Sequence, residues 1–115
     1  MRQRAALART MALRPAILLM DEPFSALDAQ TKMRLQGELV SAVHAANVTA
    51  VIITHDLTEA VVLADRIYVM SPRPGRIIRE MTIDLPSHQD PTERYFDRRT
   101  TDYVKELWSL LAEHH

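Results

Sequence analysis

Two short apolar runs on either side of one long helical segment constrain the fold of this chain more than any other feature. Residues 16–20 are wholly apolar and residues 48–54 are β-branched almost throughout, so both are predicted to be strands buried on both faces. The segment Ala29 to Ala46 is predicted to be a helix, with Asp28 as its N-cap and Asn47 as its C-terminal stop. Strand, helix and strand form a βαβ unit, which predicts parallel strands in an α/β fold.

The long helix carries a wide apolar stripe, as expected for a helix that lies on a sheet. Gly37 interrupts it and costs the helix about 1 kcal/mol relative to alanine. A close contact between the helix and the sheet would explain a glycine at this position.

Weaker patterns predict the remaining elements. The capping box Asp56-x-x-Glu59 predicts a helix through Ala64, followed by a strand over residues 66–70. A turn over residues 71–75 leads to a fourth strand over residues 76–85, nearer a sheet edge.

The last part of the chain is predicted to be helical. Asp90-Pro91 can begin a helix with proline in its first position. A final amphipathic helix is expected from apolar residues at helical spacing: Tyr103 or Val104, Leu107, Trp108 and Leu111. The aromatic residues of this tail are expected to form a small core.

Composition excludes several kinds of site. The 115 residues include only Gly37 and Gly75, so neither a G-x-x-x-x-G-K-[ST] phosphate loop nor a dinucleotide-binding loop can be built. A formal net charge of −1 disfavours a nucleic-acid partner. The absence of cysteine excludes a disulfide framework and fits a reducing compartment. No apolar run approaches the roughly 20 residues that cross a bilayer.

Two carboxylates follow the first apolar run directly. Asp21 and Glu22 lie at the carboxyl end of the predicted strand, the edge of an open α/β sheet at which ligands bind. An aspartate there can hold Mg²⁺, and a neighbouring glutamate can accept a proton from water or orient it. The alternative is that the pair merely ends a strand in solvent.

His55 stands at the carboxyl end of the second predicted strand. If the two strands are neighbours, His55 lies at the same sheet edge as Asp21 and Glu22, where it can donate a hydrogen bond to a phosphate oxygen or to water. A histidine with a purely structural role is the alternative. Between the carboxylates and the long helix, residues 23–28 form a turn in which Phe24 and Leu27 are expected to anchor the core.

These residues, in this order, resemble the second half of the ATPase subunit of an ABC transporter. Residues 17–22 resemble the Walker B strand with its catalytic glutamate, and His55 resembles the switch histidine of the H-loop. Four residues resemble the D-loop of the family: Ser25, Ala26, Leu27 and Asp28. The chain begins with Met1, Arg2 and Gln3, which resemble the residues that follow the L-S-G-G signature of the family. The sequence over residues 71–77 and 83–86 is most similar to importers of the nitrate, sulfonate and taurine group.

The resemblance implies a fold and a set of roles. The fold would be the C-terminal part of a P-loop NTPase domain of the RecA-like, ABC type, incomplete, with a mostly parallel sheet and flanking helices. That part would occupy residues 1–85, followed by a helical tail at residues 86–115. Asp21 would bind Mg²⁺ through water, Glu22 would polarise the attacking water, and His55 would contact the γ-phosphate of ATP.

The resemblance also implies partners. A homodimer would form across an interface made by Ser25, Ala26, Leu27, Asp28, Met1, Arg2 and Gln3. The pair would drive a membrane permease and would serve a periplasmic-type solute-binding protein indirectly. Its place would be peripheral, on the cytoplasmic face of the inner or plasma membrane, and no nucleic acid would be involved.

The Walker A loop, the adenine-stacking aromatic residue, the Q-loop and the L-S-G-G of the family would lie before Met1. We therefore expect ATP and Mg²⁺ to need that missing half, and the chain alone to be inactive and poorly soluble. One alternative is a remnant that binds a permease or a full-length ATPase subunit without hydrolysing ATP. Another is an unrelated α/β binding domain, such as a phospho-acceptor module that uses Asp21, which would leave His55 and residues 25–28 unexplained.

Overall fold

A computed structural model describes Arg9 and residues 16–72, 75–85 and 90–114. The chain is α/β and divides into two compact units, Met1–Thr54 with Gln89–Pro91 and His55–His88 with Thr92–His115. The composition of residues 3–13 predicts a further helix, which lies outside the described residues apart from Arg9, which is helical. The proposed interface residues Met1, Arg2 and Gln3 also lie outside them.

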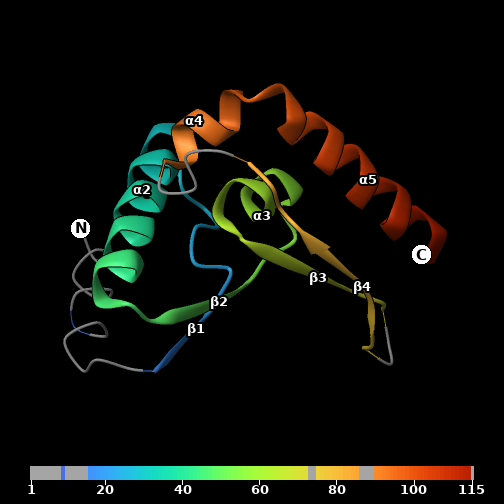
Figure 1. Ribbon diagram of the computed structural model, residues 1–115, viewed down its shortest axis with the longest axis horizontal. Coiled ribbons are helices and arrows are strands. Elements are labelled where there is room, and N and C mark those ends of the chain that lie inside the picture. The colour runs from blue at the N-terminus through green and yellow to red at the C-terminus, as the bar shows by residue number, and fades with distance from the viewer. Residues whose placement is uncertain (1–8, 10–15, 73–74, 86–89, 115) are drawn as a thin grey trace. The chain divides into compact units, whose positions relative to one another are not determined.

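The first unit contains the βαβ unit (Figure 1). Strand β1 spans Ile17–Asp21, helix α2 spans Ala29–Ala46, and strand β2 spans Thr49–Ile53. The two strands pair in parallel, with Ile17 opposite Thr49 and Asp21 opposite Ile53. Both the βαβ arrangement and the parallel pairing predicted from the sequence are confirmed.

The ends of α2 are those predicted. The side chain of Asp28 accepts a hydrogen bond from the backbone N–H of Thr31, and Asn47 takes the left-handed conformation at φ 54°. In that conformation the N–H of Asn47 donates to the carbonyls of Val43 and His44. Local capping chemistry therefore sets both ends of this helix.

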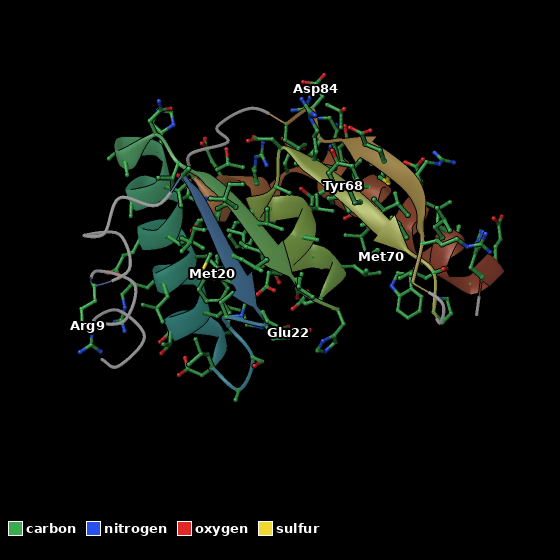
Figure 2. The ribbon with its side chains drawn as sticks, turned by 90° about the horizontal axis from the view of Figure 1, so that it is seen from below. Arg9, Met20, Glu22, Tyr68, Met70 and Asp84 are labelled. Atoms are coloured by element: carbon green, nitrogen blue, oxygen red, sulfur yellow. The ribbon has the colours of Figure 1, made fainter. Side chains whose placement is uncertain are left out.

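One face of β1 and β2 is covered and the other is open. Leu18 of β1 is buried, as are Leu35 and Leu39 of α2, which lies beside the strands in both views (Figures 1 and 2). Ile17 and Leu19 alternate with Leu18 and are 64% and 66% exposed. The prediction of burial on both faces is wrong because an apolar run reports hydrophobicity and not the layers available, and α2 supplies a layer on one side only.

The second unit begins with helix α3, Leu57–Leu63, and the hairpin of strands β3, Arg66–Met70, and β4, Ile77–Thr82. The hairpin is antiparallel, with an irregularity between Val69 and Met70. The described residues thus form two separate two-stranded sheets instead of one mostly parallel sheet. Helices α4, Pro91–Phe96, and α5, Arg98–His114, complete the unit.

Helix α5 packs against α3 and β3 to close the core of the second unit (Figure 1). The buried side chains of this core are Val61, Val69, Met81, Ile83, Leu85, Leu107 and Leu110. The helical tail therefore supplies two leucines to the core that α3 and the hairpin share. The division predicted at residue 85 stays a prediction.

Of the four aromatic residues in the tail, Tyr103 packs against the core of the second unit, and the other three do not form the small core expected from the sequence. Trp108 is 65% exposed and Phe96 is 74% exposed, with Tyr95 half exposed beside Phe96. The buried stripe of α5 passes through Leu107 and Leu110, and Trp108 falls at its edge. Helical spacing predicted the buried face of α5 but did not fix its centre, which lies one position away from Trp108.

Gly37 does not mark a close approach of α2 to the sheet. Among the described residues, no heavy atom lies within 4 Å of the position that a Cβ would take there. The glycine therefore weakens the helix without a packing benefit.

We predict that Gly37→Ala stabilises the first unit by about 1 kcal/mol, because alanine restores helix propensity in open space. On a unit of this size the gain corresponds to a melting temperature higher by roughly 4–8 °C, measured by circular dichroism. The control is Gly75→Ala, where a Cβ would meet the Cε of Met70 at 3.4 Å outside any helix. An equal gain from both substitutions would contradict the helix argument.

We further predict that the open face of the first sheet makes the chain self-associate, because aliphatic strands with unpaired edges favour pairing between molecules. Replacing Leu19 and Val51 by lysine should weaken association by about tenfold or more, since each aliphatic side chain contributes about 1.5–3 kcal/mol when buried. Light scattering after size-exclusion chromatography measures this, with Thr82→Lys on β4 as control. A monomeric wild-type chain that melts cooperatively would contradict the prediction.

Candidate functional site

The carboxylate pair predicted from the sequence stands at the carboxyl end of the parallel strands. Asp21 is the last residue of β1 and is exposed, and Glu22 follows it at the tip of the strand (Figure 2). The N–H of Glu22 donates to the carbonyl of Ile53 over 2.8 Å, which extends the pairing with β2 by one further hydrogen bond. The backbone of Glu22 is therefore fixed against the second strand.

Glu22 has a left-handed backbone, with φ at 50°. For a residue with a side chain this conformation costs roughly 1–2 kcal/mol. Residues held in such conformations cluster at functional sites, where the surroundings impose them. In a continuous strand, Asp21 and Glu22 would point to opposite faces. Because β1 ends at Asp21, the left-handed turn and not the pleat sets the direction of Glu22.

Ser25 holds this turn together. Its N–H and its hydroxyl both donate to the carbonyl of Glu22, at 3.3 and 3.1 Å. Ala26, the next residue, is also left-handed at φ 65°. Phe24 is buried and Leu27 is half-buried, so the expected anchoring of this segment is confirmed for Phe24 and partial for Leu27.

Asp28 ends the segment and begins α2. Its two carboxylate oxygens accept from the N–H and the hydroxyl of Thr31, at 2.9 and 2.8 Å. The backbone hydrogen bond from Thr31, followed by the one from its hydroxyl, lowers the pKa of Asp28 below its usual value because both favour the charged form. Thr31 was not singled out from the sequence, although a hydroxyl three residues after an N-cap aspartate is a readable signal.

Asp21, Glu22 and residues 25–28 belong to the first unit, and His55 is the first residue of the second unit. Along the chain His55 lies two residues beyond Ile53, the partner of Asp21 in the strand register. The next residue, Asp56, caps α3 by accepting from the N–H of Glu59 at 3.0 Å. The N-cap role of Asp56 in the capping box predicted from the sequence is confirmed.

The donor set of this region suits a hard cation such as Mg²⁺. Asp21 supplies an exposed carboxylate at the strand end, and carboxylate oxygen is a ligand that Mg²⁺ prefers. Within the described ranges, no group of three or more His, Cys, Asp or Glu residues is placed to hold a metal ion. Mg²⁺ needs no such cage when substrate phosphates and water complete its shell.

Comparison with known proteins identifies the family. The chain is 47% identical over 116 residues to the nitrate import ATP-binding protein NrtD of Synechocystis sp., a match that covers 96% of this chain and 44% of that protein. It is 44% identical over 113 residues to an uncharacterized ABC transporter ATP-binding protein of Methanocaldococcus jannaschii, covering 98% and 41%. The chain is homologous to the C-terminal portion of ABC transporter ATP-binding subunits.

A further relative of this ABC chain is the aliphatic sulfonates import ATP-binding protein SsuB 2 of Burkholderia cenocepacia. The two are 48% identical over 90 residues, which cover 78% of this chain and 33% of the relative. No family model matches the chain. The chain spans less than half the length of these curated relatives. None of the helices in the described part is long and apolar enough to cross a membrane.

We predict that Asp28→Asn flattens the dependence of stability on pH at acid pH. Asparagine still caps a helix but does not titrate. Because the folded pKa of Asp28 is lowered, its contribution is complete above the unfolded pKa of about 3.9 and is lost as pH falls through the folded value. Urea unfolding between neutral pH and about pH 2.5 should show the two proteins converging below pH 4. As a matched control, Thr31→Val should weaken the same effect, and identical pH profiles in all three proteins would contradict the assignment.

Proposed function

We propose that this chain is the catalytic-carboxylate part of an ATP-hydrolysing subunit of an ABC importer, with a fold that forms part of a P-loop NTPase domain. One observation carries the proposal. A chain homologous to ABC ATP-binding subunits places Asp21 and a strained Glu22 at the carboxyl end of a parallel strand pair. Ligands bind at that edge of α/β sheets.

The roles follow from the position of each group. Asp21, exposed at the strand end, would hold Mg²⁺ through water. Glu22 would polarise the attacking water, and its fixed backbone sets the point from which the carboxylate extends, which matters because phosphoryl transfer depends chiefly on positioning. His55, two residues past β2, would donate a hydrogen bond to the γ-phosphate of ATP.

The segment Ser25 to Asp28 would cross the interface with a second copy. Two features support this role: the segment leaves the site directly, and its residues Ser25 and Asp28 are exposed. The residues Met1, Arg2 and Gln3 would face the same partner. The dimer would work with a membrane permease at the cytoplasmic face, and a solute-binding protein would deliver the solute.

Nitrate and aliphatic sulfonates appear in the names of two relatives, so we infer that the importer belongs to that group. We also propose that the 115 residues alone do not turn over ATP. They contain no phosphate loop, and carboxylates that activate water have nothing to act on unless the phosphates are positioned.

The test uses the chain alone and a chimera in which it replaces the matching C-terminal stretch of the Synechocystis protein. We expect no steady-state ATP hydrolysis from the chain and clear hydrolysis from the chimera. Glu22→Gln should lower the turnover of the chimera by about 10²–10⁴-fold, the range typical of a lost acid–base group. The control is Glu80→Gln, because Glu80 is an exposed carboxylate on β4 that pairs with Arg66 at 3.8 Å.

Hydrolysis by the chain alone that Glu22→Gln abolishes would overturn the proposed inactivity. A chimera indifferent to Glu22→Gln would overturn the role of that carboxylate. The open aliphatic face of the first unit favours one other function, a non-hydrolysing chain that seats on a permease or on a full-length ATPase subunit. Copurification with the permease, together with a chimera inactive in every form, would support it.

A further inference from the structure

The second unit contains a buried arginine that the roles above do not use. Arg94 lies in α4 and is 2% exposed. Burial of a charged group is costly unless it is well hydrogen-bonded, and this burial lowers the pKa of Arg94 while the negative charge of Asp65 opposes the shift. The hydrogen bonds that offset this burial show which segments the side chain connects.

The guanidinium of Arg94 donates to backbone carbonyls at two places. Its Nη1 donates to the carbonyl of Ala64 at 2.8 Å and more weakly to that of Val61 at 3.4 Å. Its Nη2 reaches the carbonyl of Leu85 at 3.4 Å. One side chain thus connects the end of α3 to the segment that follows β4.

The carbonyls of Val61 and Ala64 are those at the C-terminal end of α3, where the helix dipole is negative. The last turn of α3 contains no basic residue of its own. Arg94 therefore supplies from α4 the cation that a helix commonly carries in its last turn.

Helix α3 is short enough to need this support. A seven-residue helix is marginal by itself in water. Its N-terminal end is held by the Asp56 cap, and the residue before that cap is His55. Seven residues rise only about 10 Å, so a shift at the Arg94 end moves the Asp56 end as one rigid body.

Arg94 is itself fixed from α5. The hydroxyl of Thr100, a buried residue, donates to the carbonyl of Arg94 at 2.5 Å. Tyr103 of α5 accepts from the N–H of Asp84 at 3.0 Å, next to the Leu85 carbonyl that Arg94 contacts. The helical tail therefore sets where the guanidinium lies.

We infer that Arg94 is a positioning residue for His55, acting through α3. This inference depends on the proposed function for the role of His55, but the hold of Arg94 on α3 can be tested without it. It gives the helical tail a part in ATP hydrolysis although the tail contributes no group to the reacting phosphate.

The first experiment measures amide hydrogen exchange in the 115-residue chain. In Arg94→Met, the amides of Ala60 and Ala64 in α3 should exchange about tenfold faster or more, while the Ile83 amide, bonded to the Asp65 carbonyl at 2.9 Å, keeps its protection. Arg94→Lys keeps the charge but loses the fork that reaches Leu85, so it should restore protection in part. Unchanged α3 protection in Arg94→Met, or an equal loss at Ile83, would overturn the inference. Should Arg94→Met not fold, Arg94→Lys and Arg94→Gln are compared in its place, and equal α3 protection in both would likewise overturn it.

The second experiment measures ATP hydrolysis by the chimera described above, at a temperature at which every variant is folded. Arg94→Met should lower kcat by about tenfold with KM for ATP unchanged, and Arg94→Lys should recover part of the loss. Arg79→Met is the matched control, because it removes an exposed arginine of the same unit that pairs with Glu106 at 3.4 Å, and it should leave kcat unchanged.

The decisive measurement is a double-mutant cycle with His55→Ala. If Arg94 acts through His55, Arg94→Met should change kcat by less than about twofold in the His55→Ala background. Additive losses would overturn the inference. If His55→Ala and Glu22→Gln both leave hydrolysis intact, the proposed function fails, while the exchange experiment still decides whether Arg94 holds α3.

Discussion

The hydrogen bond from the N–H of Glu22 to the carbonyl of Ile53 is the constraint on which the arrangement of the first unit depends. It is the last link between the two parallel strands, and it fixes the chain at the point where β1 ends. Everything that follows takes its direction from that point: the left-handed turn, the double hydrogen bond from Ser25 and the start of α2 at Asp28. Glu22 is thereby held in a left-handed backbone conformation that is unfavourable for a residue with a side chain.

The parts of the fold that the sequence predicted are those that neighbouring residues decide. Asp28 and Asp56 cap their helices through residues three positions further along the chain, and Asn47 ends α2 with its own backbone. Such signals need no knowledge of the tertiary structure, so capping chemistry and hydrophobic pattern agree and the bounds of α2 are those predicted. The parallel pairing of β1 and β2 follows from the helix between them.

The parts that the sequence did not predict depend on contacts between distant segments. Which faces of a strand are covered depends on the number of layers around it, and Ile17 and Leu19 carry no sign of this. The left-handed turn at Glu22 accompanies a hydrogen bond to Ile53 of β2, and no glycine stands at this position to indicate a positive φ from the sequence. Arg94 lies 33 residues from Val61 in the chain, and an arginine in a polar tail would be assigned to the surface by composition alone.

The open aliphatic face of the first sheet has a consequence for the life of the chain inside a cell. Exposed apolar surface makes a chain prone to aggregation, and chaperones and proteases remove unfolded chains so effectively that a loss of about 1–2 kcal/mol of stability can change abundance several-fold. The exposed side chains of Ile17, Leu19 and Ile53 form apolar surface of the kind that unfolded chains expose. Its cellular concentration would then depend on how quickly it is degraded as well as on its own rate of synthesis.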